Sequence, residues 1–269
     1  MQAIAGSRLT AELRRLGLTE GGIAMVHTRM SALGWVVGGS ETVVRSLLDA
    51  LGPDGTLAAY ASWEEHVYHA AEWPQEHRDV YLAEPPVFDP ATAEAVRDHG
   101  RIPERVRTWP GAERSAHPEA SVAAVGPRAS WLTDAHPAHD AYGKGSPFAR
   151  LVQAKGEVLL LGAPLETTTL LHHAEAIARV PDKRRVTFRI PVLEDGRVVE
   201  RTYTDIDTTD GAVAYEKTGE DPFAVIVRAA LDAGIGLHGR VGQAESHLFP
   251  APELTAFAVS WIEERFARR

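Results

Sequence analysis

Residues 156–175 read GEVLLLGAPLETTTLLHHAE, and this stretch joins two different hydrophobic patterns. Residues 157–162 contain a short continuous apolar run, which predicts a buried β-strand. Residues 168–178 have the pattern of a helix. A strand followed closely by a helix is typical of an α/β sheet, so the stretch predicts that fold class.

The N-terminal part of the chain repeats this alternation of helix and strand. Leucines recur at helical spacing in residues 9–16, and a short apolar run predicts a strand at residues 23–26. A second periodic segment at residues 43–51 predicts a helix, and residues 56–60 predict the next buried strand.

A β-hairpin is predicted between residues 186 and 205, where two alternating runs flank Asp195-Gly196. Asp-Gly suits a tight turn because both residues accept the positive φ angles that the turn requires. This hairpin is expected to make the sheet mixed rather than purely parallel. Amphipathic helices are predicted near the end of the chain, at residues 223–231 and 254–266.

The predicted fold class is therefore α/β, as a single domain over residues 1–269 with a mixed central sheet flanked by helices. One segment, residues 62–110, departs from this pattern. It carries three tryptophans, many prolines and mixed charge. We expect it to be an irregular surface excursion that shapes a pocket.

The composition excludes several classes of function. The formal net charge of -9 argues against binding to nucleic acid or to an anionic membrane, and it suits a cationic ligand. With no cysteine, the chain has no thiol nucleophile and no thiolate metal site. The N-terminal residues lack the apolar core of a signal peptide, and no apolar run approaches the roughly 18 residues of a membrane span. We expect a cytoplasmic protein.

His172 and Glu175 are a candidate pair for chemistry, although their spacing alone fits an ordinary helix-surface contact better. They lie three positions apart on a predicted helix and so share one face. A carboxylate beside an imidazole fixes its tautomer and raises its basicity, as a general base requires. The alternative is an ordinary contact on a solvated helix face. A zinc site is disfavoured because helical zinc pairs stand four positions apart.

Two other histidines are candidates with equally good structural alternatives. His27 ends the first predicted strand, at the edge where α/β sheets usually bind ligands. His117 precedes Pro118, which favours an extended conformation at a loop or strand entry. Each is equally well explained as a structural histidine bonded to a neighbouring loop.

Acidic side chains supply a further signal. Glu64 and Glu65 follow a tryptophan, and Asp205 and Asp207 stand where the predicted hairpin ends. A polycationic ligand needs such converging carboxylates. The alternatives are a solvated loop end and a calcium site, although the pattern of an EF-hand is missing.

Taken together, these segments resemble the antibiotic 3-N-acetyltransferase family of aminoglycoside-modifying enzymes. The resemblance covers nearly the whole chain and rests on the order and spacing of several stretches: MVHTRMSALGWVVGG (25–39), PVFDPATA (86–93), RTWPGAERSAHPEASVAAVG (107–126), GEVLLLGAPLETTTLLHHAE (156–175) and VGQAESHLFPAPELTAFAVSWIEERF (241–266). It implies a fold unlike that of the common small acetyltransferases, acetyl-CoA as donor and no metal. The implied reaction is acetylation of the 3-amino group of a deoxystreptamine ring, which gives antibiotic resistance.

The resemblance also implies roles for individual residues. The catalytic histidine and glutamate of the family correspond to His172 and Glu175. Its acidic substrate-binding positions correspond to Asp205, Asp207 and either Glu64 or Glu65. The stretches that face coenzyme A supply four donor-site candidates: Thr28, Met30, Ser31 and Ser115. Backbone N–H groups near Ser115 or Thr28 are expected to stabilise the thioester oxyanion.

Other functions remain open at this stage. An N-acetyltransferase acting on a different amine metabolite would keep the fold and the donor. A non-catalytic polycation-binding module would bind the same ligands without reaction. A hydrolase is disfavoured because the chain has no Gly-x-Ser-x-Gly nucleophile elbow. A homodimer is compatible with all of these possibilities, and residues 65–84 follow no family pattern, so the preferred drug stays open.

Overall fold

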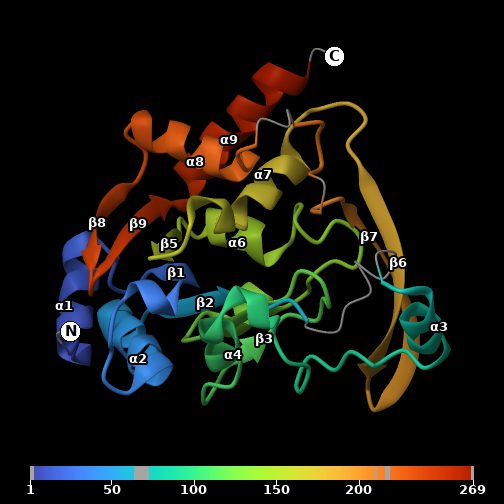
Figure 1. The fold of residues 1–269 in the computed structure, drawn as a ribbon, viewed down its shortest axis with the longest axis horizontal. Helices are drawn as coiled ribbons and strands as arrows, with labels where there is room; N and C mark the ends of the chain where they lie inside the picture. The colour runs from blue at the N-terminus through green and yellow to red at the C-terminus, as the bar shows by residue number, and fades with distance from the viewer. Residues whose placement is uncertain (1–2, 64–72, 210, 216–218, 268–269) are drawn as a thin grey trace.

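A mixed seven-stranded sheet forms the centre of the described part of the chain. The structure is a computed structural model, and it describes residues 3–63, 73–209, 211–215 and 219–267. The sheet has the strand order β3-β4-β2-β1-β5-β9-β8 (Figure 1). Its strands are β1 (Ile23–Thr28), β2 (Thr56–Tyr60), β3 (Glu113–Arg114), β4 (Val122–Val125), β5 (Glu157–Leu161), β8 (Leu237–Val241) and β9 (Ala244–Pro250).

Strand direction changes across the sheet. β1 pairs in parallel with β2 and β5, while β4 and β9 add to this parallel centre in the antiparallel direction. The edge strands β3 and β8 are also antiparallel to their neighbours. The predicted α/β fold with a mixed central sheet is confirmed.

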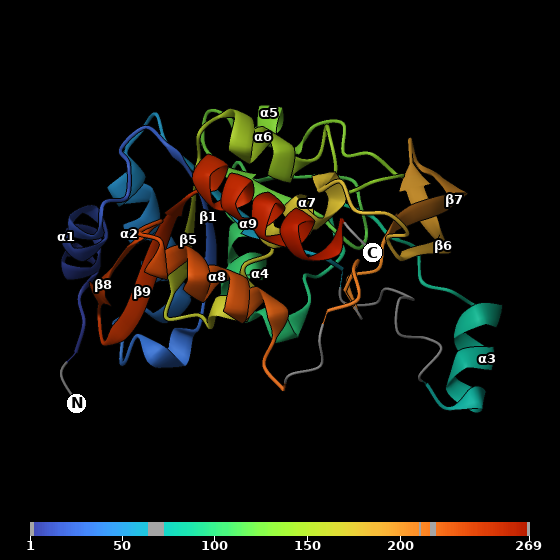
Figure 2. The ribbon, with the colours of Figure 1, turned by 90° about the horizontal axis from the view of Figure 1, so that it is seen from above.

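Helices cover both faces of the sheet (Figures 1 and 2). They are α1 (Gly6–Leu16), α2 (Gly39–Leu51), α4 (Arg101–Arg107), α5 (Ala129–Thr133), α6 (Pro147–Gln153), α7 (Leu170–Ile177), α8 (Pro222–Asp232) and α9 (Ala251–Phe266). Another helix, α3 (Gln75–Ala83), lies apart from this sheet at one end of the molecule (Figure 2). Side chains of α1, α2 and α4 join one hydrophobic cluster, and those of α5 to α9 join another. Among the described residues, no helix is both long and apolar enough to cross a membrane.

The central strands are mostly apolar, and each face of the sheet is buried. In β1, Met25 belongs to the cluster beneath α7 and α9, whereas Val26 belongs to the cluster beneath α1 and α2. Leu160 and Leu159 of β5 alternate in the same way. A strand that is buried on both faces reads as a continuous apolar run, which explains why these strands were predicted from sequence.

The predicted hairpin is present, but its place in the fold was predicted wrongly. β6 (Arg185–Glu194) and β7 (Arg197–Ile206) pair around Asp195 and Gly196, whose φ angles are 48° and 74°. They form a separate two-stranded sheet at one end of the molecule (Figure 2). Side chains of this hairpin pack with Trp63 and Phe88 in their own small cluster, and so they do not extend the central sheet.

A second hairpin, β8–β9, was missed from the sequence. It turns at Gly242, whose φ is 62°, and it places β9 beside β5. This hairpin, together with β3 and β4, makes the central sheet mixed, so the predicted reason for the mixed sheet was wrong although the class was right.

The segment at residues 62–110 is also more regular than predicted. It contains α3, α4 and the short helix η3 (Arg97–His99). α4 forms because Ile102 and Val106 bury one face against the core, while Glu104 bonds the guanidinium of Arg107 at 2.6 Å. The segment is therefore an excursion with helices of its own.

We expect the alanine substitution of Phe249 to lower the free energy of unfolding by about 3–5 kcal/mol, because this fully buried ring of β9 would leave a cavity in the larger core cluster. Leu193→Ala on the exposed side of β6 is the control, and it should cost less than about 0.5 kcal/mol. Urea unfolding of both variants measures the difference. Equal losses would contradict this assignment of the core.

Candidate active site

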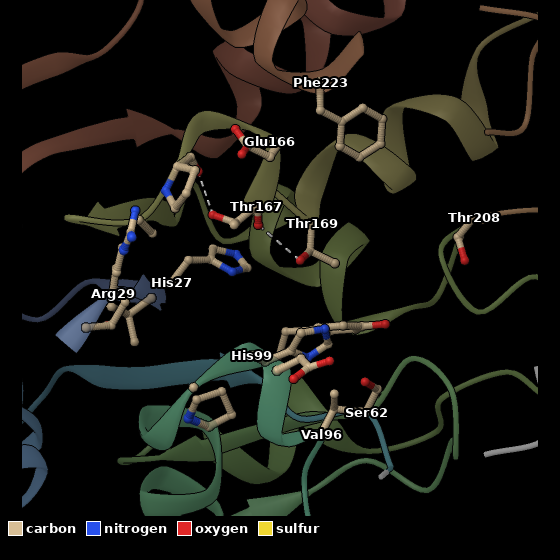
Figure 3. A pocket seen from close by; sticks show the side chains of 18 of the residues that line it. His27, Arg29, Ser62, Val96, His99, Glu166, Thr167, Thr169, Thr208 and Phe223 are labelled. Carbon is tan, nitrogen blue, oxygen red and sulfur yellow. Dashed lines mark hydrogen bonds between the residues drawn. The ribbon is translucent and has the colours of Figure 1, made fainter. Parts of the chain in front are cut away.

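A cavity of about 1090 Å³ opens at the carboxyl ends of β1 and β2. Parallel strands end at the same edge of a sheet, and α/β folds bind ligands at that edge. Further walls come from the residues after β5, from α7, from η3 and α4, and from Thr208 and Thr209 after β7 (Figure 3). The cavity is large enough to hold the reacting parts of two ligands.

His172 of α7 lines this cavity and is held by a buried carboxylate. Its Nδ1 lies 2.8 Å from Oε2 of Glu175, whose side chain is fully buried. The other oxygen, Oε1, accepts hydrogen bonds from the Tyr215 hydroxyl at 2.8 Å and from the backbone N–H of Ala212 at 3.3 Å. With Nδ1–H donated to Glu175, Nε2 of His172 keeps its lone pair, as a general base requires.

Aromatic rings fix the orientation of His172. Its ring centroid lies 5.0 Å from that of Tyr142 and 4.7 Å from that of Phe223 on α8. The side chain is 18% exposed, so one part of the ring still faces the cavity. The imidazole therefore contacts Glu175, Tyr142 and Phe223, and part of it remains accessible from the cavity.

One wall of the cavity carries two linked tyrosines and a buried glutamate. The hydroxyls of Tyr60 and Tyr142 lie 2.9 Å apart, and Tyr60 donates to the carbonyl oxygen of Glu119 at 2.8 Å. Burial, followed by repulsion from Asp205, raises the pKa of the Glu119 carboxyl from 4.5 to about 8. Near neutral pH this carboxyl is thus mostly neutral, and an ammonium group beside it would favour its charged form.

The structure places three of the four donor-site candidates at the cavity. Thr28 ends β1, and Met30 and Ser31 lie in the short helix η1 (Met30–Ala32) that follows it. Two exposed arginines, Arg29 and Arg101, lie beside them, and neither side chain has a hydrogen bond or ion pair with another described residue. These cations suit an anionic ligand such as a phosphate group.

Two predicted site residues lie in the protein interior instead. Oγ of Ser115 accepts the backbone N–H of Val122 at 2.9 Å and also contacts His136. The carboxylate of Asp205 accepts the backbone N–H groups of Ala141 and Ile206, both at 2.9 Å. Neither residue is among those that line the cavity, and the donor-site role of Ser115 and the substrate-binding role of Asp205 stay predictions. Both hold loops in place with their side-chain oxygens.

The remaining acidic candidates have different outcomes. Asp207 is not among the lining residues, but its carboxylate accepts the backbone N–H of Thr209, which does line the cavity. Glu64 and Glu65 lie outside the described residues.

The two further histidine candidates lie in different places, one at the cavity and one in the interior. His27 lines the cavity from the end of β1. His117 is fully buried, accepts the backbone N–H of Ala120 at 3.1 Å and packs against His136 and Tyr203. Of the two interpretations of His117, the structure supports the structural histidine.

Sequence reasoning missed the acidic side chains that do line the cavity: Glu119, Asp98 and Glu166. They come from three separate segments of the chain; Glu119 and Glu166 lie within stretches that carry the family resemblance, but no spacing pattern marked them as site residues. Within the ranges that the structure describes, no group of three or more His, Asp or Glu side chains is placed to hold a metal ion.

Comparisons of sequence and of structure match this chain to the same family of proteins. The family model described as aminoglycoside 3-N-acetyltransferase matches residues 25–263. The aminoglycoside N(3)-acetyltransferase VIII of Streptomyces fradiae is 51% identical over 266 residues, which cover 97% of this chain and 93% of that protein.

Solved structures agree with the sequence comparison. The crystal structure of the aminoglycoside acetyltransferase AAC(3)-Xa matches with a TM-score of 0.94 and 48% identity, covering 99% of this chain and 95% of that one. The structure of AAC-IIIb with CoASH matches with a TM-score of 0.92 and 42% identity, covering 100% and 99% of the two chains.

The raised pKa of Glu119 predicts a pH-dependent loss of stability. The unfolded chain releases this proton near pH 4.5, whereas the folded protein keeps it up to about pH 8. The folded state therefore binds more protons in this window, and stability falls as pH rises through it. Compared with Glu119→Gln, the wild type should lose stability between pH 5 and pH 8, measured by urea unfolding at both values. A difference that does not change with pH would contradict the prediction.

Proposed function

Because this chain belongs to the aminoglycoside 3-N-acetyltransferase family, we propose that it transfers the acetyl group of acetyl-CoA to the 3-amino group of the deoxystreptamine ring of an aminoglycoside. Such acetylation gives resistance to the drug. The observation that carries the proposal is the His172–Glu175 pair in a cavity that is lined by both arginines and carboxyl groups. We also propose a cytoplasmic location, where acetyl-CoA is available.

His172 is the general base in this proposal. The amine of an aminoglycoside is largely protonated near neutral pH, and it must lose a proton before its lone pair can attack the thioester. Nε2 of His172 takes that proton. The resulting imidazolium is stabilised by the buried carboxylate of Glu175, which Tyr215 and Ala212 hold in place.

The two substrates enter from regions of different charge. Arg29 and Arg101 beside Thr28 suit the phosphate groups of coenzyme A. On the drug side, Asp98, Glu119 and Glu166 line the cavity and suit the remaining ammonium groups. Asp207, Glu64 and Glu65 stay in the proposal as outer acidic positions implied by the family resemblance, whereas Asp205 is left out of it.

The first test is drug-dependent release of coenzyme A thiol. Purified protein is mixed with acetyl-CoA and with gentamicin, tobramycin or neomycin one at a time, and free thiol is followed with a colorimetric reagent. The protein has no cysteine and so adds no thiol background. Release with a deoxystreptamine drug is expected. Binding of a drug without thiol release would favour a non-catalytic binding module. Thiol release only with another amine would indicate that this amine, and not an aminoglycoside, accepts the acetyl group.

The alanine substitution of His172 should lower kcat by about 10²–10⁴ with little change in drug affinity, because the base is lost but the acidic contacts remain. Steady-state thiol release and calorimetric drug binding measure the two effects. His238→Ala, at an exposed position of β8, is the control and should retain full turnover. Full turnover of the His172 variant at saturating substrates would refute the assignment of the base.

A further inference from the structure

Two adjacent side chains at the end of β1 present buried polar atoms without hydrogen-bond partners. These atoms are Nε2 of His27 and Oγ1 of Thr28, and both residues line the cavity. Buried polar groups in folded proteins are almost always hydrogen-bonded, because leaving one unpaired is costly. Where such atoms face a cavity, the expected partner is a ligand.

His27 differs from His172 in its surroundings. No carboxylate holds it, and neither of its ring nitrogens bonds to any residue in the described ranges. Burial, with a smaller effect of the nearby His99, lowers the pKa of the His27 imidazole from 6.5 to about 3. The ring therefore stays neutral near neutral pH, with one N–H donor and one acceptor nitrogen.

His27 lies on the part of the cavity wall that adjoins the start of α7. Figure 3 shows its ring directed into the cavity, with Thr167 and Thr169 on one side and His99 on the other. Thr169 is the residue directly before α7, the helix that carries His172. His27 also comes directly before the donor-site candidates that begin with Thr28.

Acetyl transfer needs a hydrogen-bond donor for the thioester oxygen. The backbone N–H of Arg29, just after Thr28, donates to the carbonyl oxygen of Leu161 at 3.1 Å. Ser115 lies away from the cavity, and its hydroxyl is bonded in the interior. The side-chain atoms of His27 and Thr28 that lack partners are at the cavity and can take this role.

We propose that His27 is a further catalytic residue, whose Nε2–H donates a hydrogen bond to the thioester carbonyl oxygen of acetyl-CoA. The hydroxyl of Thr28 is the second donor. A neutral imidazole suits this task because it adds no positive charge beside a polycationic drug. This inference rests on the proposed acetyl transfer.

The step balances as follows. His172 takes a proton from the substrate ammonium, and the amine lone pair forms a C–N bond to the thioester carbon. The electron pair of the C=O π bond moves to oxygen, where His27 and Thr28 donate hydrogen bonds. When the C=O bond forms again, the C–S bond breaks. The imidazolium of His172 then gives its proton to the coenzyme A thiolate, and the second proton on the new amide nitrogen passes to water, so the products are the N-acetyl drug, free thiol and one proton in solution.

Two variants of similar size test the donor. His27→Gln keeps an N–H near the position of Nε2, whereas His27→Leu fills the space without a donor. We expect the leucine variant to lose about 10²–10³ in kcat, the typical loss for one oxyanion donor, with less than about threefold change in the KM of the drug. The glutamine variant should stay within about tenfold of the wild type.

An infrared measurement reads the hydrogen bond without turnover. With acetyl-CoA labelled with ¹³C at the carbonyl and no drug present, the isotope-edited thioester band should lie at lower wavenumber when bound to the wild type than in solution. In the leucine variant it should return towards the solution value, while calorimetry still shows acetyl-CoA binding. His247→Leu is the matched control: Nδ1 of this half-buried histidine of β9 is also without a partner, but it does not line the cavity.

Either of two results would overturn the inference. The first is a kcat of the His27→Leu variant that equals that of the wild type or that of the His27→Gln variant. The second is a thioester band that is the same with the wild type and with the leucine variant, even if the KM of the drug rises. Failure of the proposed function looks different: the wild type itself then releases no thiol with any aminoglycoside, while the band can still be measured with acetyl-CoA alone.

Discussion

The buried carboxylate of Glu175 is the group on which the site depends. It is shielded from water, and the donors around it come from different parts of the chain: His172 on its own helix, and Ala212 and Tyr215 beyond the β6–β7 hairpin. A buried charge without such partners would be strongly destabilising. Satisfying it therefore joins α7 to the segment after the hairpin and sets the tautomer of the imidazole in the same step.

The sheet supplies the place where this pair can act. β1, β2 and β5 run in parallel and end at one edge, and the segments that leave that edge form the walls of the cavity. Both signs of charge line it: Arg29 and Arg101, and the carboxyl groups of Asp98, Glu119 and Glu166. A protein with net charge -9 can thus still present cations to an anionic donor while it offers carboxylates to a polycationic acceptor.

The two cavity histidines show how environment assigns chemistry to one residue type. His172 has a carboxylate on Nδ1, and this partner fixes the tautomer that leaves Nε2 as the acceptor. His27 has no such partner, and burial keeps its ring neutral. An acyl transfer needs a base and a neutral donor at the same time, and the different partners of these side chains separate the two tasks.

Local sequence determined the central parallel strands, one hairpin turn and one contact of the site. Continuous apolar runs predicted β1, β2 and β5, Asp195-Gly196 predicted the hairpin turn, and the three-residue spacing of His172 and Glu175 predicted their contact, because each feature depends on neighbours a few positions away. Tertiary structure decided the rest. The pattern of β6 and β7 could not show that they pair apart from the central sheet, and nothing near Ser115 or Asp205 indicated that backbone N–H groups from other segments would engage them. Whether a polar side chain faces a cavity or the interior depends on which distant segments pack against it, and that information is spread over the whole chain.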